Sequence, residues 1–518
     1  MSVRRILPLA ALVTVSAVVL TGCFPFSFLS GGGGGSQTTN TSTGEEVDAD
    51  LERFYDQELT WRNLGGGVDE TRITVPLDWD APTGDTIELA IARHNASRDS
   101  MGSMLMNPGG PGGSGYDFVA QYAQYIVTPD VLANYDVIGF DPRGVGQSSP
   151  IVCTDGAEKD ELLYGTFDSA YGTPAWIDEL TVAETAWIDA CVENTGDLLG
   201  NLDAASVARD MDVIRAVLGD EKLTYLGYSY GTYLGAVYAE LFPQKVGRMV
   251  LDGAVDPLVG DLDALATQMA GFESAYRAFL EFCFASGDCP FNGSVDAAMQ
   301  QTEDLILAVG DDGLTGDDGR VLDTATIGTG LINALYAESL WSGLVQMLAD
   351  LKAGDPQSTF DSADEYNSRV APGVYDGNGY EIYTAVTCNE GTLGTDGVSP
   401  LEGLAVIEQK APYLGFATAL DDYVALDVTC SNWPFPVADL PTSFAAEGAP
   451  PILVVGTTND PATPYAQAVS LARQLSSGVL ISYEGEGHTI YAQGVACVDD
   501  AVDAYFLRGE VPSADPMC

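Results

Sequence analysis

A serine at the centre of a Gly-x-Ser-x-Gly motif has the setting in this chain that most directly suggests chemistry. Ser229 lies between residues 223–228, whose apolar, aromatic and β-branched composition indicates a strand, and residues 230–241, whose apolar positions recur at helical spacing. A sharp turn from strand to helix leaves little room around its central residue, and Gly227 and Gly231 provide that room. Such a turn lifts the serine hydroxyl clear of the sheet, so Ser229 is a candidate nucleophile.

A serine becomes a nucleophile when a base takes its proton, and the chain offers two histidines for that role. His94 ends an early strand-like run, where a surface or edge position is the simpler interpretation. His488 follows another strand-like run, residues 479–483, and lies in the loop Glu-Gly-Glu-Gly-His. Because the glycines make this loop flexible enough to reach across the end of a sheet, we predict that His488 is the base.

The carboxylate that orients such a histidine is expected at the end of the preceding strand. Asp460 follows the run Pro-Ile-Leu-Val-Val-Gly, which is typical of a buried parallel strand. Asp252 and Asp256 follow a different strand-like run and are alternatives, because some hydrolases take their acid from that place. We predict Asp460, since the chain order Ser229, Asp460, His488 is that of an α/β-hydrolase.

Acyl transfer also needs hydrogen-bond donors for the oxyanion, ideally backbone N–H groups that are in place before the reaction begins. The segment 107–115, Asn-Pro-Gly-Gly-Pro-Gly-Gly-Ser-Gly, lets the main chain approach a substrate carbonyl closely. Gly110, or its neighbour Gly109, is the predicted second donor beside the N–H of Tyr230. A phosphate-binding loop is disfavoured, because two prolines remove donors and the chain has no Gly-x4-Gly-Lys-Ser/Thr motif.

Two charged residues follow the strand-like run at residues 135–138. Asp141 and Arg143 lie in the segment Gly-Phe-Asp-Pro-Arg-Gly-Val-Gly-Gln-Ser. We interpret this segment as a brace for the site, in which the two side chains have a structural role as an ion pair or as a clamp on the loop.

Six segments together resemble the secreted tripeptidyl aminopeptidases of actinobacteria. They are NPGGPGGSG, GFDPRGVGQSS, ARDMDVIRAVLGDEKLTYLGYSYGTYLG, LDGAVDP, GTTNDPATP and GEGHT, and the resemblance covers residues 55–518. That family is related to prolyl aminopeptidase within the α/β-hydrolase superfamily. The resemblance implies release of short peptides, tripeptides by the family's name, from a free N-terminus without a metal or cofactor. It places nucleophile, acid and base on Ser229, Asp460 and His488.

One departure from the prolyl aminopeptidases concerns the oxyanion loop. Those enzymes carry a histidine at its start, where this chain has Asn107 followed by a proline. Strict specificity for proline is therefore not implied.

An exopeptidase must recognise the ammonium group of its substrate, and a buried carboxylate near the nucleophile is the physical means. The segment Ala-Val-Thr-Cys-Asn-Glu resembles a cysteine-plus-acid segment of the family's cap region. We therefore expect Glu390 to bind the N-terminal ammonium, with Asn389 assisting. The alternative is that Glu390 is one solvated acid among many in an acidic chain.

The spacing of the strand-like runs predicts a large insertion. Roughly two hundred residues separate the run that ends at residue 251 from the one that begins at residue 451, far more than a connection between strand and helix requires. We expect this insertion to be a mainly helical cap over Ser229, with amphipathic helices near residues 264–285, 295–309 and 325–351.

The predicted fold is α/β, with a mostly parallel sheet flanked by helices and the cap inserted before the last strands. A chain of 518 residues with 46% hydrophobic content can bury such a core and carry a second lobe. The expected divisions are a lipoprotein-type signal peptide at residues 1–23, a flexible tether at 24–50, the first part of the hydrolase core at 51–258, the cap at 259–445 and the rest of the core at 446–518.

The N-terminal residues predict secretion. Two arginines precede an uncharged apolar run at residues 6–20, which indicates a secretory signal rather than a spanning helix. The following Leu-Thr-Gly-Cys resembles a bacterial lipobox, which implies that Cys23 becomes a lipidated N-terminus; an ordinary cleaved signal is the alternative. Gly, Ser and Thr then form the tether. We expect an extracytoplasmic enzyme that meets the outer face of the cell membrane only through this lipid.

Eight cysteines remain after Cys23, and an even number outside the cytoplasm predicts disulfides. The sequence does not determine their connectivity, although pairing of sequential neighbours would close four local loops, 153–191, 283–289, 388–430 and 497–518. The cysteines and histidines do not have the spacing of a metal site, so we expect no metal.

The chain is strongly acidic, with 75 acidic and 21 basic residues and a formal net charge of −54. This charge argues against nucleic-acid binding, and it favours cationic substrates through long-range attraction. A well-solvated surface suited to a salty habitat is the simpler explanation of the charge. The sequence does not indicate an oligomeric state.

Two other classes of protein share parts of these patterns. A carboxylesterase or lipase would use the same three residues on small esters, because fold and triad do not determine the acyl group. A binding lipoprotein of this fold would have lost the triad, whereas this chain has all three positions and the oxyanion loop. The sequence therefore favours an enzyme, with peptides that have a free N-terminus as the expected substrates.

Overall fold

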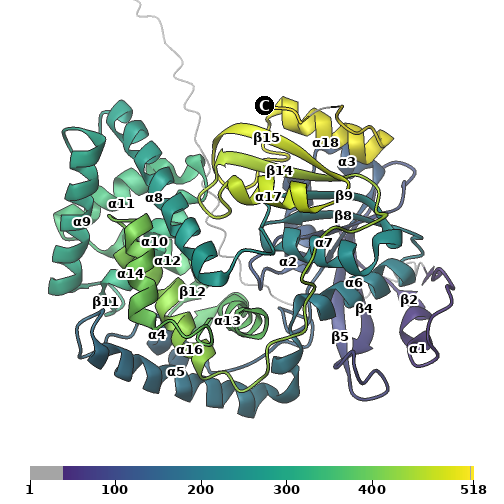
Figure 1. Cartoon of the computed structure of the whole chain (residues 1–518), viewed down its shortest axis with the longest axis horizontal. Coiled ribbons are helices and arrows are strands. Elements are labelled where there is room, and N and C mark those ends of the chain that lie inside the picture. The colour runs from purple at the N-terminus through teal and green to yellow at the C-terminus, as the bar shows by residue number, and fades with distance from the viewer. Residues whose placement is uncertain (1–38, 392, 514) are drawn as a thin grey trace, which may run out of the picture. The chain divides into compact units, whose positions relative to one another are not determined.

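Nine strands form one mixed sheet in the computed structural model (Figure 1), in the spatial order β15, β14, β9, β8, β6, β7, β5, β4, β3. Six neighbours are parallel: β15 (Gly478–Glu486), β14 (Ile452–Asn459), β9 (Val246–Asp252), β8 (Leu223–Tyr228), β6 (Ser103–Asn107) and β7 (Asp136–Phe140). The sheet continues antiparallel through β5 (Thr86–His94), β4 (Val68–Pro76) and β3 (Arg62–Gly65). The six parallel strands therefore end at one common edge.

Helices cover both faces of this sheet, and the side chains of each strand alternate between them. Met104 and Met106 of β6 pack on one face with α2 (Gly115–Ile126), α3 (Pro129–Asn134) and α18 (Ala496–Arg508). Leu105 packs on the opposite face, against the core that contains α6 (Ala204–Val217), α7 (Tyr230–Leu241) and α17 (Ala466–Gln474). This three-layer arrangement is the predicted α/β-hydrolase fold.

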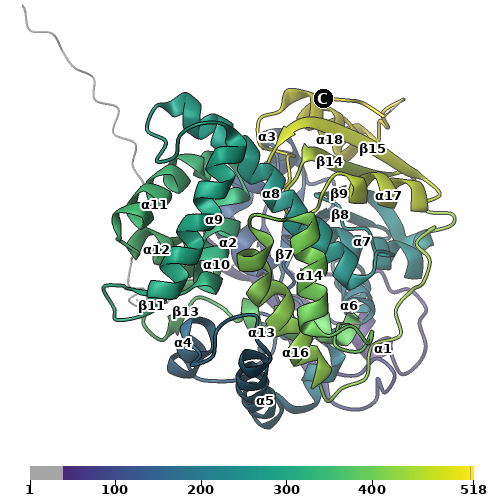
Figure 2. The ribbon, with the colours of Figure 1, turned by 60° about the vertical axis from the view of Figure 1, so that its left-hand side comes forward.

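A separate apolar core holds the cap, whose helices lie to one side of the sheet (Figure 2). The cap helices are α8 (Asp261–Ser286), α9 (Val295–Asp312), α10 (Thr324–Leu335), α11 (Trp341–Ala353), α12 (Gln357–Tyr366), α13 (Gly379–Glu390), α14 (Pro400–Lys410), α15 (Gly415–Ala419), the π-helix η4 (Leu420–Ala425) and α16 (Leu426–Ser431). Tyr164 of α4 (Gly156–Tyr164) and Trp176 of α5 (Pro174–Thr195) belong to the same core. The cap core thus includes residues from well before position 259, where the predicted cap begins.

The structure describes residues 39–391, 393–513 and 515–518. Its remaining elements are short: β1 (Thr39–Asn40), α1 (Glu52–Tyr55), β2 (Leu59–Thr60), η1 (Gly196–Asn201), η2 (Pro243–Lys245), β10 (Leu314–Thr315), β11 (Val321–Leu322), η3 (Glu338–Leu340), β12 (Arg369–Ala371) and β13 (Val374–Tyr375). Within these ranges, no helix has the length and apolar character that crossing a membrane requires.

The helix predicted at residues 325–351 is two helices. Helix α10 ends at Leu335, and α11 begins only at Trp341. Between them Ala337 has an extended backbone, with φ −146° and ψ 140°. The break leaves the carbonyl of Tyr336 free of the helix, and this carbonyl accepts a hydrogen bond from the N–H of His488.

The predicted signal peptide, with Cys23, and the tether up to residue 38 lie outside the described residues. The rest of the predicted tether is docked on the core rather than flexible. Thr39–Asn40 pairs with Leu59–Thr60, and the carboxylate of Glu45 accepts a hydrogen bond from Arg215 at 2.6 Å. Glu45 is a second carboxylate partner of this buried arginine, which also bonds Asp212, and so ties the stretch to the core.

Four disulfides join the eight cysteines as sequential neighbours, 153–191, 283–289, 388–430 and 497–518. The sequence left this connectivity open, and the structure has the pairing that closes four local loops. The bond between Cys388 and Cys430 ties α13 to α16 within the cap. Four disulfides indicate an oxidising environment, such as the outside of a cell.

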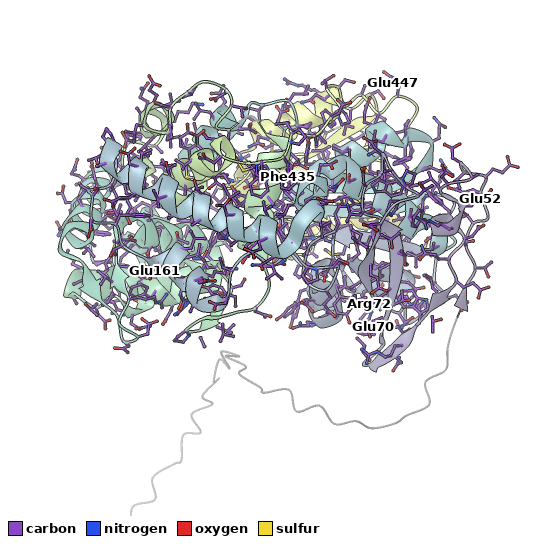
Figure 3. All side chains as sticks on the ribbon, turned by 90° about the horizontal axis from the view of Figure 1, so that it is seen from below. Glu52, Glu70, Arg72, Glu161, Phe435 and Glu447 are labelled. Atoms are coloured by element: carbon purple, nitrogen blue, oxygen red, sulfur yellow. A yellow bond between two sulfur atoms is a disulfide. The ribbon has the colours of Figure 1, made fainter. Side chains whose placement is uncertain are left out.

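Many acidic side chains of the described residues are exposed. Figure 3 labels Glu52, Glu161 and Glu447, which come from distant parts of the chain and are all exposed. Water solvates such side chains at little cost, so they account for much of the net charge without implying a binding site.

Candidate active site

Ser229 occupies the predicted turn between β8 and α7, whose bounds match the predicted strand and helix. Its backbone has φ 54° and ψ −125°, a conformation that residues other than glycine rarely adopt. A Cβ atom at Gly227 would lie 2.4 Å from the carbonyl oxygen of Gly231, and one at Gly231 would lie 2.7 Å from that of Asn107. The two glycines are therefore required by the close approach of β6, β8 and α7.

His488 and Asp460 meet at the ends of β15 and β14. Nδ1 of His488 lies 2.9 Å from each carboxylate oxygen of Asp460, so the Nδ1–H is held by the carboxylate. Asp460 also accepts hydrogen bonds from the backbone N–H groups of Ala462 and Thr463. The other ring nitrogen, Nε2, is buried and has no hydrogen-bond partner among the described residues. His488 and Ser229 line the same cavity, so this nitrogen is the one available to a serine proton.

Carboxylates raise the pKa of His488. Burial alone would lower the pKa, because it disfavours the charged imidazolium. The negative charge and hydrogen bond of Asp460, together with the charge of Asp252, outweigh burial, so the pKa of His488 lies above its usual value of about 6.5.

The two alternative acids make their hydrogen bonds away from the histidine ring. The buried carboxylate of Asp252 accepts hydrogen bonds from the N–H groups of Ile490 and Tyr491, at 2.9 and 2.8 Å. It therefore holds the turn that follows His488, and burial raises its pKa to about 6. Asp256 instead accepts hydrogen bonds from Leu258 and from a glutamine of α17.

Thr463 is part of the site, although the sequence motifs described above do not include it as a site residue. Its hydroxyl lies 3.1 Å from a carboxylate oxygen of Asp460 and 3.3 Å from Nδ1 of His488. A signal was present, because Asp followed by Pro-Ala-Thr is a sequence in which the aspartate can accept bonds from residues two and three positions later.

The glycine-rich loop after β6 places one of its two candidate donors correctly. The N–H of Gly109 donates to the side-chain oxygen of Asn107 at 2.9 Å, so it is not available to a substrate. The N–H of Gly110 has no acceptor among the described residues, and Gly110 lines both cavities that Ser229 lines. Tyr230 begins α7, so its N–H has no acceptor within the helix. Gly110 and Tyr230 are therefore the better pair of oxyanion donors.

Gly109 has a packing role instead. Its φ is +94°, and a Cβ atom there would lie 2.8 Å from Cβ of Ser229. The absence of a side chain lets the loop lie directly against the nucleophile turn.

Asp141 and Arg143 do not pair with each other, contrary to one of the two expected arrangements. Arg143 makes two 2.8 Å bonds to Asp210 of α6, and both side chains are fully buried. Asp141 accepts hydrogen bonds from the hydroxyl of Ser114 and from the N–H of Gln147. Asp141 is therefore a clamp on the loop, as the second expected arrangement had it, because its carboxylate joins the start of α2 to the loop after β7.

Glu390 does not lie where an ammonium site was expected. It lines neither cavity that Ser229 lines, and its carboxylate accepts hydrogen bonds from the hydroxyl of Tyr230 and the N–H of Ala204. Burial, and then the neighbouring charge of Asp203, raises its pKa to about 8. A carboxyl group that keeps its proton at neutral pH offers an ammonium no opposite charge, so the contacts indicate that Glu390 supports Tyr230.

Asn389, which was expected to assist Glu390, is also used within the protein. Its amide nitrogen donates to the carbonyl of Leu199 at 2.6 Å, and its amide oxygen accepts from the indole of Trp433 at 2.8 Å. Only 1% of the residue is exposed, so Asn389 fixes the end of α13 and does not face a substrate.

Two cavities meet at Ser229. One has a volume of about 330 Å³ and is lined by residues of α8, α10, α12, α13 and η4, so it lies beneath the cap. The other, of about 290 Å³, lies on the side of His488. Ser229, Gly110 and Tyr336 line both, so a substrate bound across Ser229 would occupy one cavity on each side of the reacting bond.

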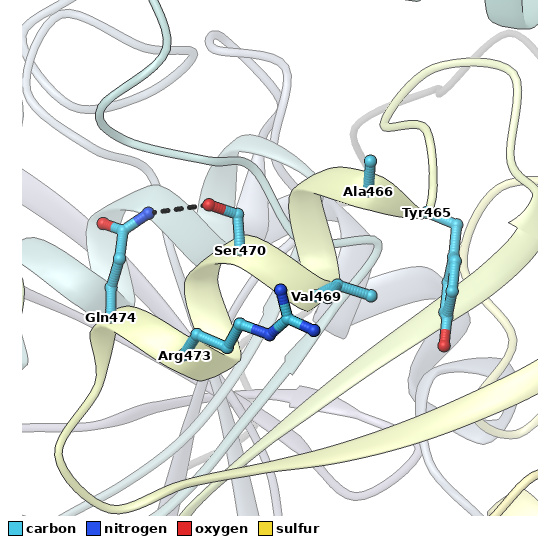
Figure 4. A pocket seen from close by; sticks show the side chains of 6 residues that line it. All are labelled: Tyr465, Ala466, Val469, Ser470, Arg473 and Gln474. Atoms are coloured by element: carbon cyan, nitrogen blue, oxygen red, sulfur yellow. Dashed lines mark hydrogen bonds between the residues drawn. The ribbon is translucent and has the colours of Figure 1, made fainter.

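A larger hollow of about 510 Å³ lies away from Ser229, along α17 (Figure 4). It is lined by six residues between positions 465 and 474, and its polar groups include the hydrogen-bonded pair Gln474 and Ser470. Its lining lacks the nucleophile, the histidine and the acid, so its size does not make it the active site.

The fold and the residues at the ends of β8, β14 and β15 define a serine hydrolase of the α/β-hydrolase class. Residues 417–518 match the family model described as TAP-like protein. Serine protease Hip1 of Mycobacterium tuberculosis is 34% identical over 525 residues, which covers 99% of this chain and 98% of that protein. The chain belongs to the actinobacterial TAP-like family.

Other relatives differ in their named activities. Tripeptidyl aminopeptidase of Streptomyces lividans is 33% identical over 454 residues, covering 86% of this chain and 82% of that protein. Carboxylesterase B of Mycobacterium tuberculosis is 38% identical over 449 residues, covering 86% and 85%. A solved epoxide hydrolase from an endophytic Streptomyces is 14% identical with a TM-score of 0.35, over 88% of this chain and all of that one. The relatives thus include both peptidases and an esterase.

Proposed function

We propose that this protein is a serine exopeptidase that releases short peptides, chiefly tripeptides, from free N-termini through an acyl-enzyme. The observation that carries the proposal is the cavity of about 330 Å³ beneath the cap. It lies at the lower end of the range for small-ligand pockets, about 300–1,000 Å³, so a short acyl segment fits and a long chain does not. The names of the peptidase relatives support the same substrate class.

The proposed reaction begins when Nε2 of His488 takes the proton of the Ser229 hydroxyl as its oxygen attacks the scissile carbonyl. Asp460 holds the opposite nitrogen and stabilises the imidazolium that forms. The N–H groups of Gly110 and Tyr230 then donate to the oxyanion of the tetrahedral intermediate.

Collapse of this intermediate breaks the peptide bond. His488 returns the proton to the departing amine. The amine then leaves through the cavity of about 290 Å³ that His488 lines. The acyl group remains esterified to Ser229 in the cavity beneath the cap. A water molecule, activated by the same histidine, hydrolyses the ester and frees the short peptide.

Turnover of matched substrates tests the proposal. The comparison uses Ala-Ala-Pro-p-nitroanilide with a free N-terminus, the same anilide with an acetylated N-terminus, and p-nitrophenyl butyrate. Cleavage of the free-amine anilide with little cleavage of the acetylated one supports the exopeptidase. Equal cleavage of both anilides would contradict it.

A carboxylesterase is the second candidate, because Carboxylesterase B is 38% identical to this chain. The same nucleophile, base and oxyanion donors would hydrolyse a small ester. Butyrate turnover without cleavage of either anilide would identify this activity.

We also propose that Cys23 carries a lipid that anchors the enzyme to the outer face of the cell membrane. The support is the Leu-Thr-Gly-Cys sequence and the four disulfides of an oxidising environment. Metabolic labelling with an alkyne fatty acid should mark the natural protein and not Cys23→Ala. Labelling of both proteins alike would exclude Cys23 as the site.

A further inference from the structure

A carboxylate from the cap lines the same cavity as Ser229. It belongs to Asp422, which lies in the π-helix η4 (Leu420–Ala425). A π-helix is rare and is often found at functional sites. Here the π-helix connects α15 and α16 and forms part of the wall beneath the cap.

Asp422 gives this cavity its charge. Among the described residues that line the cavity, it is the only aspartate, glutamate, lysine, arginine or histidine, and the others are apolar, aromatic, hydroxyl or amide side chains and glycines. A bound cation would therefore meet a negative charge that no lysine or arginine of the lining opposes. An anionic group in the same place would meet only repulsion.

Aromatic rings surround the carboxylate. Tyr336, Tyr366 and Tyr383 line the cavity, and burial followed by the negative charge of Asp422 raises the pKa of each of these phenols. The phenols therefore stay neutral and close to the carboxylate. A carboxylate bordered by tyrosine rings suits an ammonium group. The ammonium forms a charge-assisted hydrogen bond with the carboxylate and cation–π contacts with the rings.

We propose that Asp422 binds a primary ammonium group of the acyl part of the substrate. This inference rests on the proposed exopeptidase function and assigns to Asp422 the role first expected for Glu390. The ammonium could be the N-terminus of a peptide or the end of a lysine side chain, since both present the same group. The cavity volume of about 330 Å³ favours the N-terminus, because it suits a short acyl segment.

Asp422→Asn tests the assignment, with Asp263→Asn as the matched control. Asp263 belongs to α8 of the cap, and 73% of its side chain is exposed. The substrates are free and acetylated Ala-Ala-Pro-p-nitroanilide, acetyl-Lys-Ala-Pro-p-nitroanilide and p-nitrophenyl butyrate. We expect Asp422→Asn to raise KM for the free-amine anilide about 10- to 100-fold, the size of a lost charged hydrogen bond, and to leave butyrate turnover within about twofold. Asp263→Asn should behave as the natural enzyme does.

The outcomes separate the inference from the function on which it rests. If the natural enzyme does not prefer the free-amine anilide, the proposed function fails. If the preference is present and Asp422→Asn retains it, the assignment of Asp422 is wrong. A loss confined to the acetyl-lysine substrate would place a side-chain ammonium at Asp422 instead of the N-terminus.

A general loss of activity would also have a clear meaning. If Asp422→Asn slows every substrate equally, including the ester, then Asp422 supports the cap and does not select the substrate. Asp422→Glu provides the second variant, because it keeps the charge. It should retain the preference for the free amine, and loss of that preference in a folded Asp422→Glu enzyme would overturn the proposal.

Discussion

The carbonyl of Tyr336 accepts a hydrogen bond from the backbone N–H of His488 at 3.0 Å, which joins the cap directly to the histidine of the site. The ring of Tyr336 also lies edge-on to the imidazole, with 5.6 Å between the ring centroids. Tyr336 therefore positions the histidine and lines both cavities that meet at Ser229.

The ring of Tyr336 should matter more than its hydroxyl. Tyr336→Phe keeps the ring and the backbone carbonyl, so we expect kcat/KM within about threefold of the natural value. Tyr336→Ala removes a ring that lines both cavities and contacts His488. We expect kcat/KM to fall on the order of 100-fold, which is the cost of misplacing a reacting group by about 1 Å. Steady-state kinetics on the free-amine anilide and the butyrate ester measure both effects. Equal losses in the two variants would contradict a positioning role for the ring.

The two buried aspartates near His488 should behave differently when neutralised. Asp460→Asn should lower kcat by about 10⁴-fold, because the amide no longer stabilises the imidazolium or selects its tautomer. Asp252→Asn should cost far less, since Asp252 bonds the backbone after His488 and not its ring. The measurement is kcat with a thermal melt for each variant. A larger loss in Asp252→Asn than in Asp460→Asn would reverse the assignment.

The acid limb of kcat/KM should lie above pH 6.5 and depend on salt. The base works only when His488 is neutral, and the charges of Asp460 and Asp252 raise its pKa, so activity appears at a higher pH than for an isolated histidine. Salt screens the wider negative field of the protein, so the limb should move to lower pH as ionic strength rises. Asp252→Asn should move it the same way. A limb that stays fixed across salt would show that the distant acidic residues do not act on His488.

The nucleophile turn should reject even a methyl group. Gly231→Ala places a Cβ atom 2.7 Å from the carbonyl oxygen of Asn107, so the turn must shift, and activity should fall by at least about 100-fold. Gly343→Ala is the matched control, because a Cβ atom there meets nothing within 4 Å on helix α11. It should leave kcat unchanged and raise stability by about 0.5–1 kcal/mol. Full activity in a folded Gly231→Ala enzyme would refute the steric argument.

Local patterns predicted the elements that carry the site. The strand at 223–228 and the helix at 230–241 have the predicted bounds, because the apolar spacing and the two glycines of the turn are local signals. Asp460 and His488 meet, as predicted, because each follows a parallel strand and such strands end at one edge of the sheet.

The remaining parts of the site depend on packing between distant segments. Nothing near Asp422 in the sequence shows that a π-helix will place this residue in the wall of the cavity that Ser229 lines. The sequence also does not show that the helix predicted at 325–351 breaks where the carbonyl of Tyr336 meets the N–H of His488. The expected position of Glu390 beside the substrate differs from the observed one for the same reason. Its segment has the expected composition, yet α13 directs the carboxylate to Tyr230 and Ala204.

The products released from an unmodified peptide test the central claim most directly. A decapeptide with a free N-terminus is incubated with the enzyme, and its fragments are identified by mass spectrometry over time. The proposed function predicts that the first fragment is the N-terminal tripeptide, that later ones follow in steps of three residues, and that Ser229→Ala releases none. First cleavage within the peptide, or cleavage of an N-acetylated decapeptide at the same rate, would contradict it.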